Sequence, residues 1–260
     1  MPAPFKTLWR LRWRWRTRQF RRAPSPPVAL VYHRVCDTAL DPLLLGVSPD
    51  HFAAQMRVLR ERCVPLAVSE FAARAVAGSL PERAVCVTFD DGYADNLHTA
   101  QPILAAHDVP ACIFVSTGLV ARGREAWWDA IEQILVHARP EHGRVRLHDA
   151  AGELEVFCPD ANAASLRVWN VECADSTTRQ TIYRKVLEWV HDKSPRVIEK
   201  HLETLRGWAG LSNEPRPDRR LMTIDEVRTA ANASHLAIGG HTVSHRVRLI
   251  PAEFNSNSRS

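Results

Sequence analysis

Residues 84–93, Ala-Val-Cys-Val-Thr-Phe-Asp-Asp-Gly-Tyr, begin as an apolar strand and end in two carboxylates and a glycine. Neighbouring residues of an extended chain point to opposite sides, so one of Asp90 and Asp91 could bind a cation while the other faces a reacting group. Gly92 lets the backbone turn sharply after them. Because Asp-Gly is also a common turn dipeptide, an ordinary junction between strand and turn is the alternative interpretation.

Residues 238–245, Ile-Gly-Gly-His-Thr-Val-Ser-His, place His241 and His245 four positions apart after a short apolar run. On a helix this spacing puts two imidazoles on one face, where they can share a metal ion. One carboxylate with two histidines would leave a position open for water, which is typical of a catalytic rather than a structural site. A lone pair of histidines often lies on a solvated helix, but the double aspartate strengthens the metal interpretation.

The two motifs resemble those of a known family. Thr88-Phe89-Asp90-Asp91-Gly92 and His241-Thr242-Val243-Ser244-His245 resemble the first and second motifs of the polysaccharide deacetylases, also called the NodB-homology or carbohydrate esterase 4 family. Residues 30–35, 127–129 and 222–226 are similar to one bacterial branch. The resemblance extends from about residue 28 to 248, with the motifs in the family's order.

The resemblance implies an activity and a role for each site residue. Asp90 would be the general base, and Asp91, His241 and His245 would hold a divalent metal, with Zn²⁺ expected. The implied function is metal-dependent hydrolysis of the N-acetyl amide of N-acetylhexosamine units, with a polysaccharide or N-acetylated oligosaccharide as partner. The alternative is a catalytically inactive relative that binds metal or glycan without turnover.

The chain also predicts an α/β fold. Strands are expected at 28–32, 111–115 and 236–239, with helices at 68–77, 96–106, 127–137 and from Thr223 to about Asn232. A further helix is expected to begin at Ser48-Pro49, with Phe52, Met56 and Leu59 along its inner face. Strand and helix alternate at short spacing, which favours parallel βαβ units with functional residues at the carboxyl ends of the strands. With the resemblance, this predicts an irregular (β/α) barrel of the deacetylase type. We interpret Trp127 and Trp128 as core packing rather than a sugar platform.

Residues 140–220 interrupt this alternation. They contain a hairpin-like piece at 144–157 and helical runs near 179–191 and 196–208, and we interpret them as a helical insertion packed on the barrel. The expected organisation is therefore a basic arm and Pro linker at 1–27, a deacetylase-like domain at 28–250 and a disordered tail at 251–260.

The family normally continues beyond its second motif with an arginine that orients the base and a late histidine that acts as the acid. This sequence stops about fifteen residues after His245, so we expect a C-terminally truncated barrel with little activity. Three explanations are open: a truncated product, a fragment of an interrupted frame, or a subfamily that uses His33 as the acid. His33 ends the first expected strand, where its side chain could also simply be satisfied by a nearby carbonyl.

The N-terminal arm carries the basic character of the chain. Residues 1–22 hold one lysine, seven arginines and no acid, against a net charge of +5 for the whole chain, so the remainder is mildly acidic. Arginines alternate with Trp9, Trp13 and Trp15, which is compatible with membrane-surface contact through residues 5–22, with a disordered tail or, less favourably, with nucleic-acid binding. No signal-peptide pattern follows, so we expect a cytoplasmic location, peripheral to the inner face of the membrane if the arm binds it.

The six cysteines show no paired spacing. Cys86 and Cys112 fall inside apolar strand runs, where free thiols are usually buried, and we expect reduced thiols rather than a disulfide framework.

Overall fold

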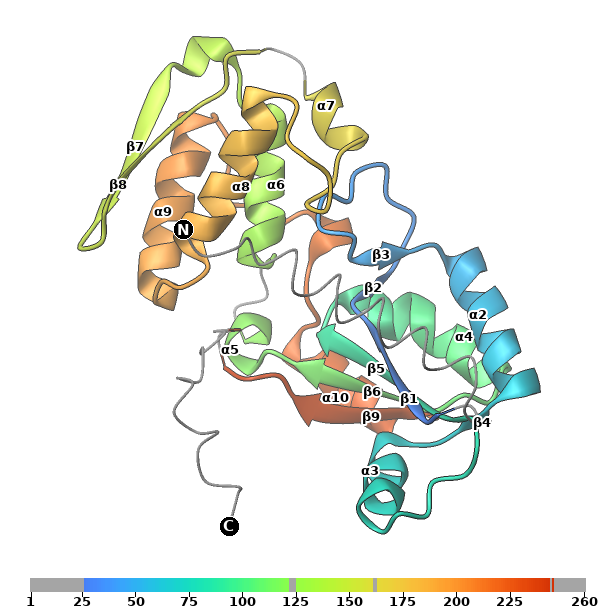
Figure 1. Cartoon of the computed structure of the whole chain (residues 1–260). Coiled ribbons are helices and arrows are strands. Elements are labelled where there is room, and N and C mark those ends of the chain that lie inside the picture. The colour runs from blue at the N-terminus through green and yellow to red at the C-terminus, as the bar shows by residue number, and fades with distance from the viewer. Residues whose placement is uncertain (1–25, 122–124, 161–162, 244, 246–260) are drawn as a thin grey trace, which may run out of the picture.

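The structure is a computed structural model that describes residues 26–121, 125–160, 163–243 and 245 (Figure 1). The arm expected to contact a membrane, residues 5–22, and the tail at 251–260 lie outside the described residues. Among the described helices, none combines the length and the apolar character needed to cross a membrane.

A parallel sheet forms the centre of the molecule. Its strand order is β1 (Val28–Tyr32), β5 (Ala84–Asp91), β6 (Ala111–Val115) and β9 (Leu236–Gly240), and the short β4 (Val64–Pro65) also pairs with β5. The α/β class and the three strands expected from the sequence are confirmed. In the part of the chain that the structure describes, the sheet is open, with β1 and β9 at its ends, so barrel closure stays a prediction.

Helices cover the sheet and join its strands. They are α2 (Pro49–Arg62), α3 (Val68–Val76), η1 (Asn96–Ala100), α4 (Gln101–Ala106), α5 (Thr117–Val120) and α10 (Ile224–Asn232). The expected helix at 96–106 begins as a π-helix, because Pro102 has no N–H to donate to the carbonyl four residues before it. The capping box of Thr223 and Glu226 is present at the start of α10, as expected.

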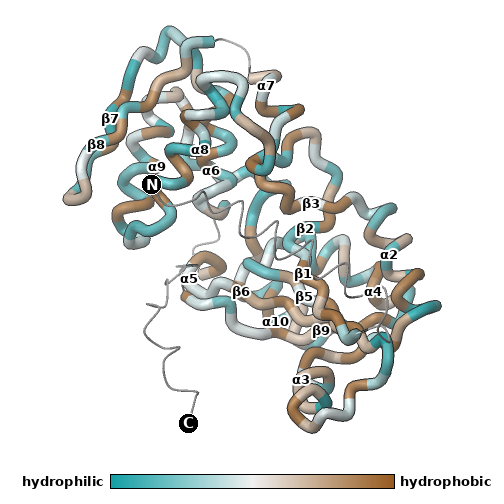
Figure 2. Tube along the Cα trace, in the orientation of Figure 1, coloured by the Kyte–Doolittle hydropathy of each residue, from teal (hydrophilic) through white to brown (hydrophobic). Residues whose placement is uncertain are grey.

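The core of this half is built from alternate residues of the strands. Val87 and Phe89 of β5 are fully buried and pack in one apolar cluster with Phe52 and Met56 of α2. Figure 2 shows hydrophobic residues along the strands of this sheet. β5 is buried at every position from Ala84 to Phe89 and pairs with β1 and β6 in a defined register, so the carboxylates at its end reach a defined place at the sheet's rim.

A second, mainly helical region stands beside the sheet (Figure 1). It contains α6 (Trp127–His137), η2 (Pro140–His142), the antiparallel pair β7 (Arg144–Asp149) and β8 (Gly152–Phe157), α7 (Ala164–Arg167), α8 (Thr178–Val190) and α9 (Pro195–Trp208). The hairpin and the two long helices match the sequence expectation for residues 140–220. This region has its own apolar cluster, in which Ile131, Tyr183 and Leu205 are fully buried.

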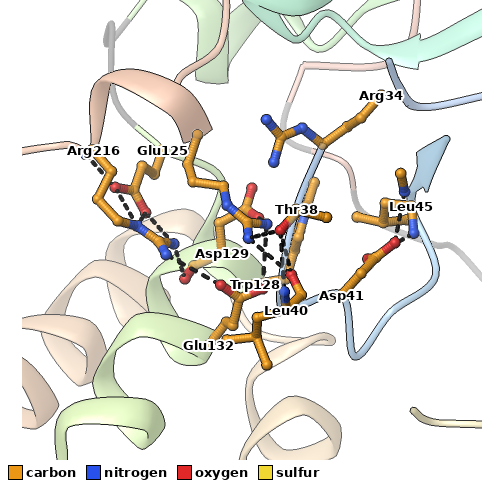
Figure 3. Close-up of polar contacts among 12 residues, drawn as sticks. Arg34, Thr38, Leu40, Asp41, Leu45, Glu125, Trp128, Asp129, Glu132 and Arg216 are labelled. Atoms are coloured by element: carbon orange, nitrogen blue, oxygen red, sulfur yellow. Dashed lines mark hydrogen bonds and ion pairs between the residues drawn. The ribbon is translucent and has the colours of Figure 1, made fainter. Parts of the chain in front are cut away.

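Charged side chains join the two regions. Arg216 binds Glu125 (Nη2–Oε2, 3.0 Å) and Glu132 (Nη1–Oε1, 3.1 Å), as Figure 3 shows. Arg219, in η3 (Pro217–Arg219), lies 3.4 Å from Glu132 and donates to the Thr38 hydroxyl, which follows β2 (Arg34–Val35). Both glutamates are buried, so removing one arginine would leave an uncompensated charge in the interior.

Candidate functional site

Asp91 is the last residue of β5 and lies in the interior. Its side chain is 2 % exposed, and its Oδ1 atom makes no hydrogen bond to a described residue. The sequence predicted an extended backbone through both aspartates, but Asp91 has φ of 71°, in the left-handed region. Gly92 follows with φ of 86°, so the chain turns one residue earlier than expected.

Burial is the largest cause that raises the pKa of Asp91 to about 7, and the nearby carboxylates of Asp90 and Asp129 contribute to the same rise. A buried carboxylate oxygen without a donor is costly, because it has lost water and gained no partner. Such an atom fits a site that supplies a positive charge.

His241 and His245 lie in a turn directly after β9. The sequence suggested a helix for their four-residue spacing, but Thr242 and Val243 form a turn in which Thr242 has φ of 63°, and His245 has φ of 52°. The tight turn still brings the two imidazole rings together, with centroids 5.1 Å apart. Within the turn, the backbone amide of His245 donates a hydrogen bond to the Thr242 hydroxyl, at 3.0 Å.

The junction between β6 and α5 holds this turn in place. The amide of Gly118 donates to the carbonyl of Val243 at 2.7 Å, and the amide of Thr117 donates to that of Thr242 at 3.2 Å. The Ser116 hydroxyl donates to the carbonyl of His241. A Cβ at position 118 would lie 2.4 Å from the Val243 oxygen, so only glycine fits there without displacing the turn.

The aspartate and the two histidines converge. Asp91 Oδ1 lies 3.8 Å from His241 Nε2 and 3.4 Å from His245 Nε2, and one potential ligand atom from each residue lies within 4.8 Å of the others. Burial lowers the pKa of His245, and the neighbouring His241 and His33 lower it further, which favours the neutral ring that can bind a metal. The donor set of one carboxylate and two imidazoles fits a divalent cation such as zinc.

Asp90 and His33 lie beside these three residues. Asp90 is half-buried, close enough to Asp91 and His33 to act on both electrostatically, and its carboxylate makes no hydrogen bond within the described part of the chain. Burial lowers the pKa of His33, and its interaction with Asp90 opposes this effect. The His33 carbonyl accepts from Asn96, but its imidazole has no hydrogen-bond partner among the described residues, which argues against the purely structural interpretation.

A cavity of about 410 Å³ opens over the site. Its floor includes His33, Asp91 and His245, and its walls come from the loop before β3 (Gly46–Val47), from α6 and from α8. The remaining lining residues are Leu43, Leu45, Trp127, Trp128, Leu187, Glu188 and His191. The helical region therefore supplies one wall of a pocket whose floor belongs to the sheet.

The interpretation of Trp127 and Trp128 as core packing agrees with their burial, since Trp127 packs against the apolar cluster of the helical region, but the two side chains also contribute to the site. Trp128 is 5 % exposed, but its indole lies against His245, with ring centroids 4.7 Å apart, and both tryptophans line the cavity. Four further lining residues belong to no sequence motif and were not expected at the site: Leu43, Leu45, Leu187 and His191. Only the adjacent aromatic pair at the start of a helix could have indicated a role at the site.

Comparison with known proteins gives the class to which these features belong. The family model described as "Polysaccharide deacetylase" matches residues 77–139, which contain both aspartates and α6. The poly-beta-1,6-N-acetyl-D-glucosamine N-deacetylase of Escherichia coli (strain K12) is 36 % identical over 86 residues. That alignment covers 32 % of this chain and 13 % of the relative, so the chain matches only a small part of the relative's length.

Among solved structures, the Streptococcus pyogenes deacetylase PplD in complex with acetate is 30 % identical, with a TM-score of 0.35, over 39 % of this chain and 47 % of that one. IcaB from Ammonifex degensii is 18 % identical, with a TM-score of 0.35, over 86 % of this chain and 93 % of that one.

The resemblance to the polysaccharide deacetylases is thus confirmed, over a stretch of the chain that contains the first motif.

Proposed function

We propose that this protein is a metal-dependent N-deacetylase that hydrolyses the acetamide of N-acetylhexosamine units in a polysaccharide. The observation that carries the proposal is the convergence of Asp91, His241 and His245 on one point at the floor of the cavity. A divalent cation held there, zinc being the expected one, would polarise the amide carbonyl and make its water easier to deprotonate.

The side chains around that point can move the protons that the reaction requires. Asp90 accepts a proton from the water that attacks the carbonyl carbon, and the bond between carbon and nitrogen then breaks. The leaving nitrogen needs a proton, for which His33, one of the residues that line the cavity, is the candidate donor. The products are acetate and the free amine of the sugar.

The lowered pKa of His33 sets a pH dependence for this step. At neutral pH most His33 side chains are uncharged, so the fraction able to donate a proton rises as the pH falls below 6.5. By its name, the Escherichia coli relative acts on poly-beta-1,6-N-acetyl-D-glucosamine, so this polymer is the first substrate to test.

The test is acetate release by the purified chain with added Zn²⁺ or Co²⁺ on β-1,6- and β-1,4-linked N-acetylglucosamine oligomers. Asp90→Asn should retain metal and lose about 10²–10⁴-fold in rate, because a base is removed and a ligand is not. Asp91→Asn should lose metal as well. Asp225→Asn, an exposed carboxylate in α10, is the matched control and should change neither quantity.

Two results would overturn the assignment. Loss of metal in Asp90→Asn with retention in Asp91→Asn would reverse the two roles. A wild-type chain that binds metal but releases no acetate from either oligomer would instead support the binding protein without turnover.

A further inference from the structure

Tyr93 follows the aspartate pair and its glycine, and its side chain is fully buried. Its hydroxyl donates to Asp129 Oδ2 at 2.6 Å and accepts from Trp128 Nε1 at 2.7 Å. Two neighbouring residues of α6 are therefore connected through one tyrosine that belongs to the sheet side of the molecule.

The chemistry of the three groups fixes the direction of these bonds. An indole N–H can only donate, so the Tyr93 oxygen must accept from Trp128 and direct its own proton to Asp129. Burial raises the pKa of Asp129 to about 7, but Oδ2 can accept from Tyr93 whether or not Oδ1 carries a proton. The indole plane is consequently held at one orientation.

That orientation places Trp128 against His245. The ring centroids are 4.7 Å apart with an interplanar angle of 54°, and the imidazole of His245 forms no hydrogen bond to a described side chain. Its charged neighbour is Asp91, at 3.4 Å. Packing against the indole on one side, with the His241 ring 5.1 Å away, therefore restrains the rotation of this ring.

The other end of the chain of hydrogen bonds reaches the charged junction between the two regions. Asp129 Oδ1 lies 3.7 Å from Arg219 Nη1, and the guanidinium of Arg34 lies 4.7 Å from the centre of the Tyr93 ring. Arg34 in turn pairs with Asp95 at 2.9 Å. Figure 3 shows Arg34, Trp128 and Asp129 in this part of the molecule.

We propose that Tyr93 is a positioning residue for the metal centre: its hydroxyl anchors Trp128 to Asp129, and Trp128 then holds the His245 ring toward Asp91. This inference rests on the proposed function, because it assumes that His245 binds the cation. Groups that orient a metal ligand typically change metal affinity by about 10–100-fold when they are removed.

The test compares Tyr93→Phe with the wild-type full chain in Co²⁺ titrations, following the visible absorption bands of the bound ion and measuring the dissociation constant of Zn²⁺ by competition. We expect metal binding about tenfold or more weaker, with altered Co²⁺ band intensity, because His245 no longer has one fixed orientation. The matched control is Tyr183→Phe, since Tyr183 is also fully buried but its hydroxyl has no hydrogen-bond partner among the described residues. It should bind both ions like the wild type.

Trp128→Phe separates positioning from general destabilisation. It retains an aromatic ring beside His245 but cannot donate to Tyr93, so it should weaken metal binding as Tyr93→Phe does, at temperatures well below the melting point of each variant. Affinity within twofold of the wild type in both variants would overturn the inference while leaving the metal centre intact. A wild-type chain that binds neither ion would overturn the proposed function itself, and the inference with it.

Discussion

The two halves of the candidate metal centre are built in different ways. The aspartate half ends the central strand β5, and the side chain of Asp91 is 2 % exposed. The histidine half follows β9, at one end of the described sheet, and His241 and His245 are 30 % and 27 % exposed. Packing fixes the first half, whereas hydrogen bonds from the junction of β6 and α5 fix the second.

This difference predicts which property a mutation in each half should change first. A half held by close packing is coupled to the stability of the whole core, so a change there should lower the free energy of unfolding. A half held by a few backbone hydrogen bonds can move while the core stays folded, so a change there should weaken metal binding first.

The largest expected effect is a loss of metal affinity caused by a change in the histidine half. Gly118→Ala places a Cβ 2.4 Å from the Val243 oxygen and must displace the turn that carries both histidines. We expect the affinity for Zn²⁺ to fall about 100-fold while the circular dichroism spectrum stays that of the wild type. Isothermal titration with Zn²⁺ measures the change.

Its matched control is Gly207→Ala in α9, where an added Cβ meets nothing within 4 Å. That change should leave metal affinity unaltered and raise stability by about 0.5–1 kcal/mol, as expected for alanine in place of glycine inside a helix. Equal metal affinity in the Gly118 and Gly207 variants would contradict the role assigned to α5.

The aspartate half is tested by Gly92→Ala. Position 92 has φ of 86°, and a Cβ there would lie 2.9 Å from Val115 Cγ1, so strain and overpacking should together cost about 2 kcal/mol of unfolding free energy. Gly210→Ala has a similar φ of 68° but meets nothing within 4 Å, so it isolates the backbone term of about 1 kcal/mol. Chemical denaturation of the metal-free variants gives both values; equal losses would show that packing against Val115 is unimportant.

The smallest expected effect is the pH dependence of Zn²⁺ affinity and of stability that Asp91 causes. Because the pKa of Asp91 is raised to about 7, metal must displace a proton below that pH, and the affinity for Zn²⁺ should fall about fivefold between pH 7 and 6 from this group. In the metal-free protein, the stability that Asp91 contributes changes with pH in the opposite direction. A raised folded-state pKa favours folding at low pH, and this contribution is lost as the pH rises from about 4 through 7.

Titrations at pH 6, 7 and 8 and denaturation of the metal-free chain test both signs. Asp91→Asn should remove the pH dependence of stability that this group supplies. If stability varies with pH in that variant as it does in the wild type, another group is responsible.

The sequence predicted much of the sheet and its helices. The apolar runs at 28–32 and 111–115 and the helix at 127–137 have the expected bounds, because burial and periodicity act over a few residues. The ligand candidates were found by their motifs, and the structure brings those residues together.

Other features had no local signal. The four-residue spacing of the histidines suggested a helix, but the left-handed backbone at Thr242 produces a turn that contacts with the distant junction of β6 and α5 stabilise. Arg216 meets Glu125 across 91 positions of sequence, and Trp128 meets His245 across more than a hundred. Such pairs depend on how the two regions pack, which no short stretch of the chain encodes.

The position of the charged junction in the chain has a consequence for the evolution of this fold. Glu125 directly precedes the helical region, Asp129 and Glu132 lie in α6 at its start, and Arg216 and Arg219 follow α9, so the ion pairs tie together the two ends of the segment between them. A segment closed at its base in this way can be exchanged for another of different length without moving the strands beneath it. Grafting a foreign segment between these anchors would thus be a direct route to reshaping the cavity while the sheet keeps its register.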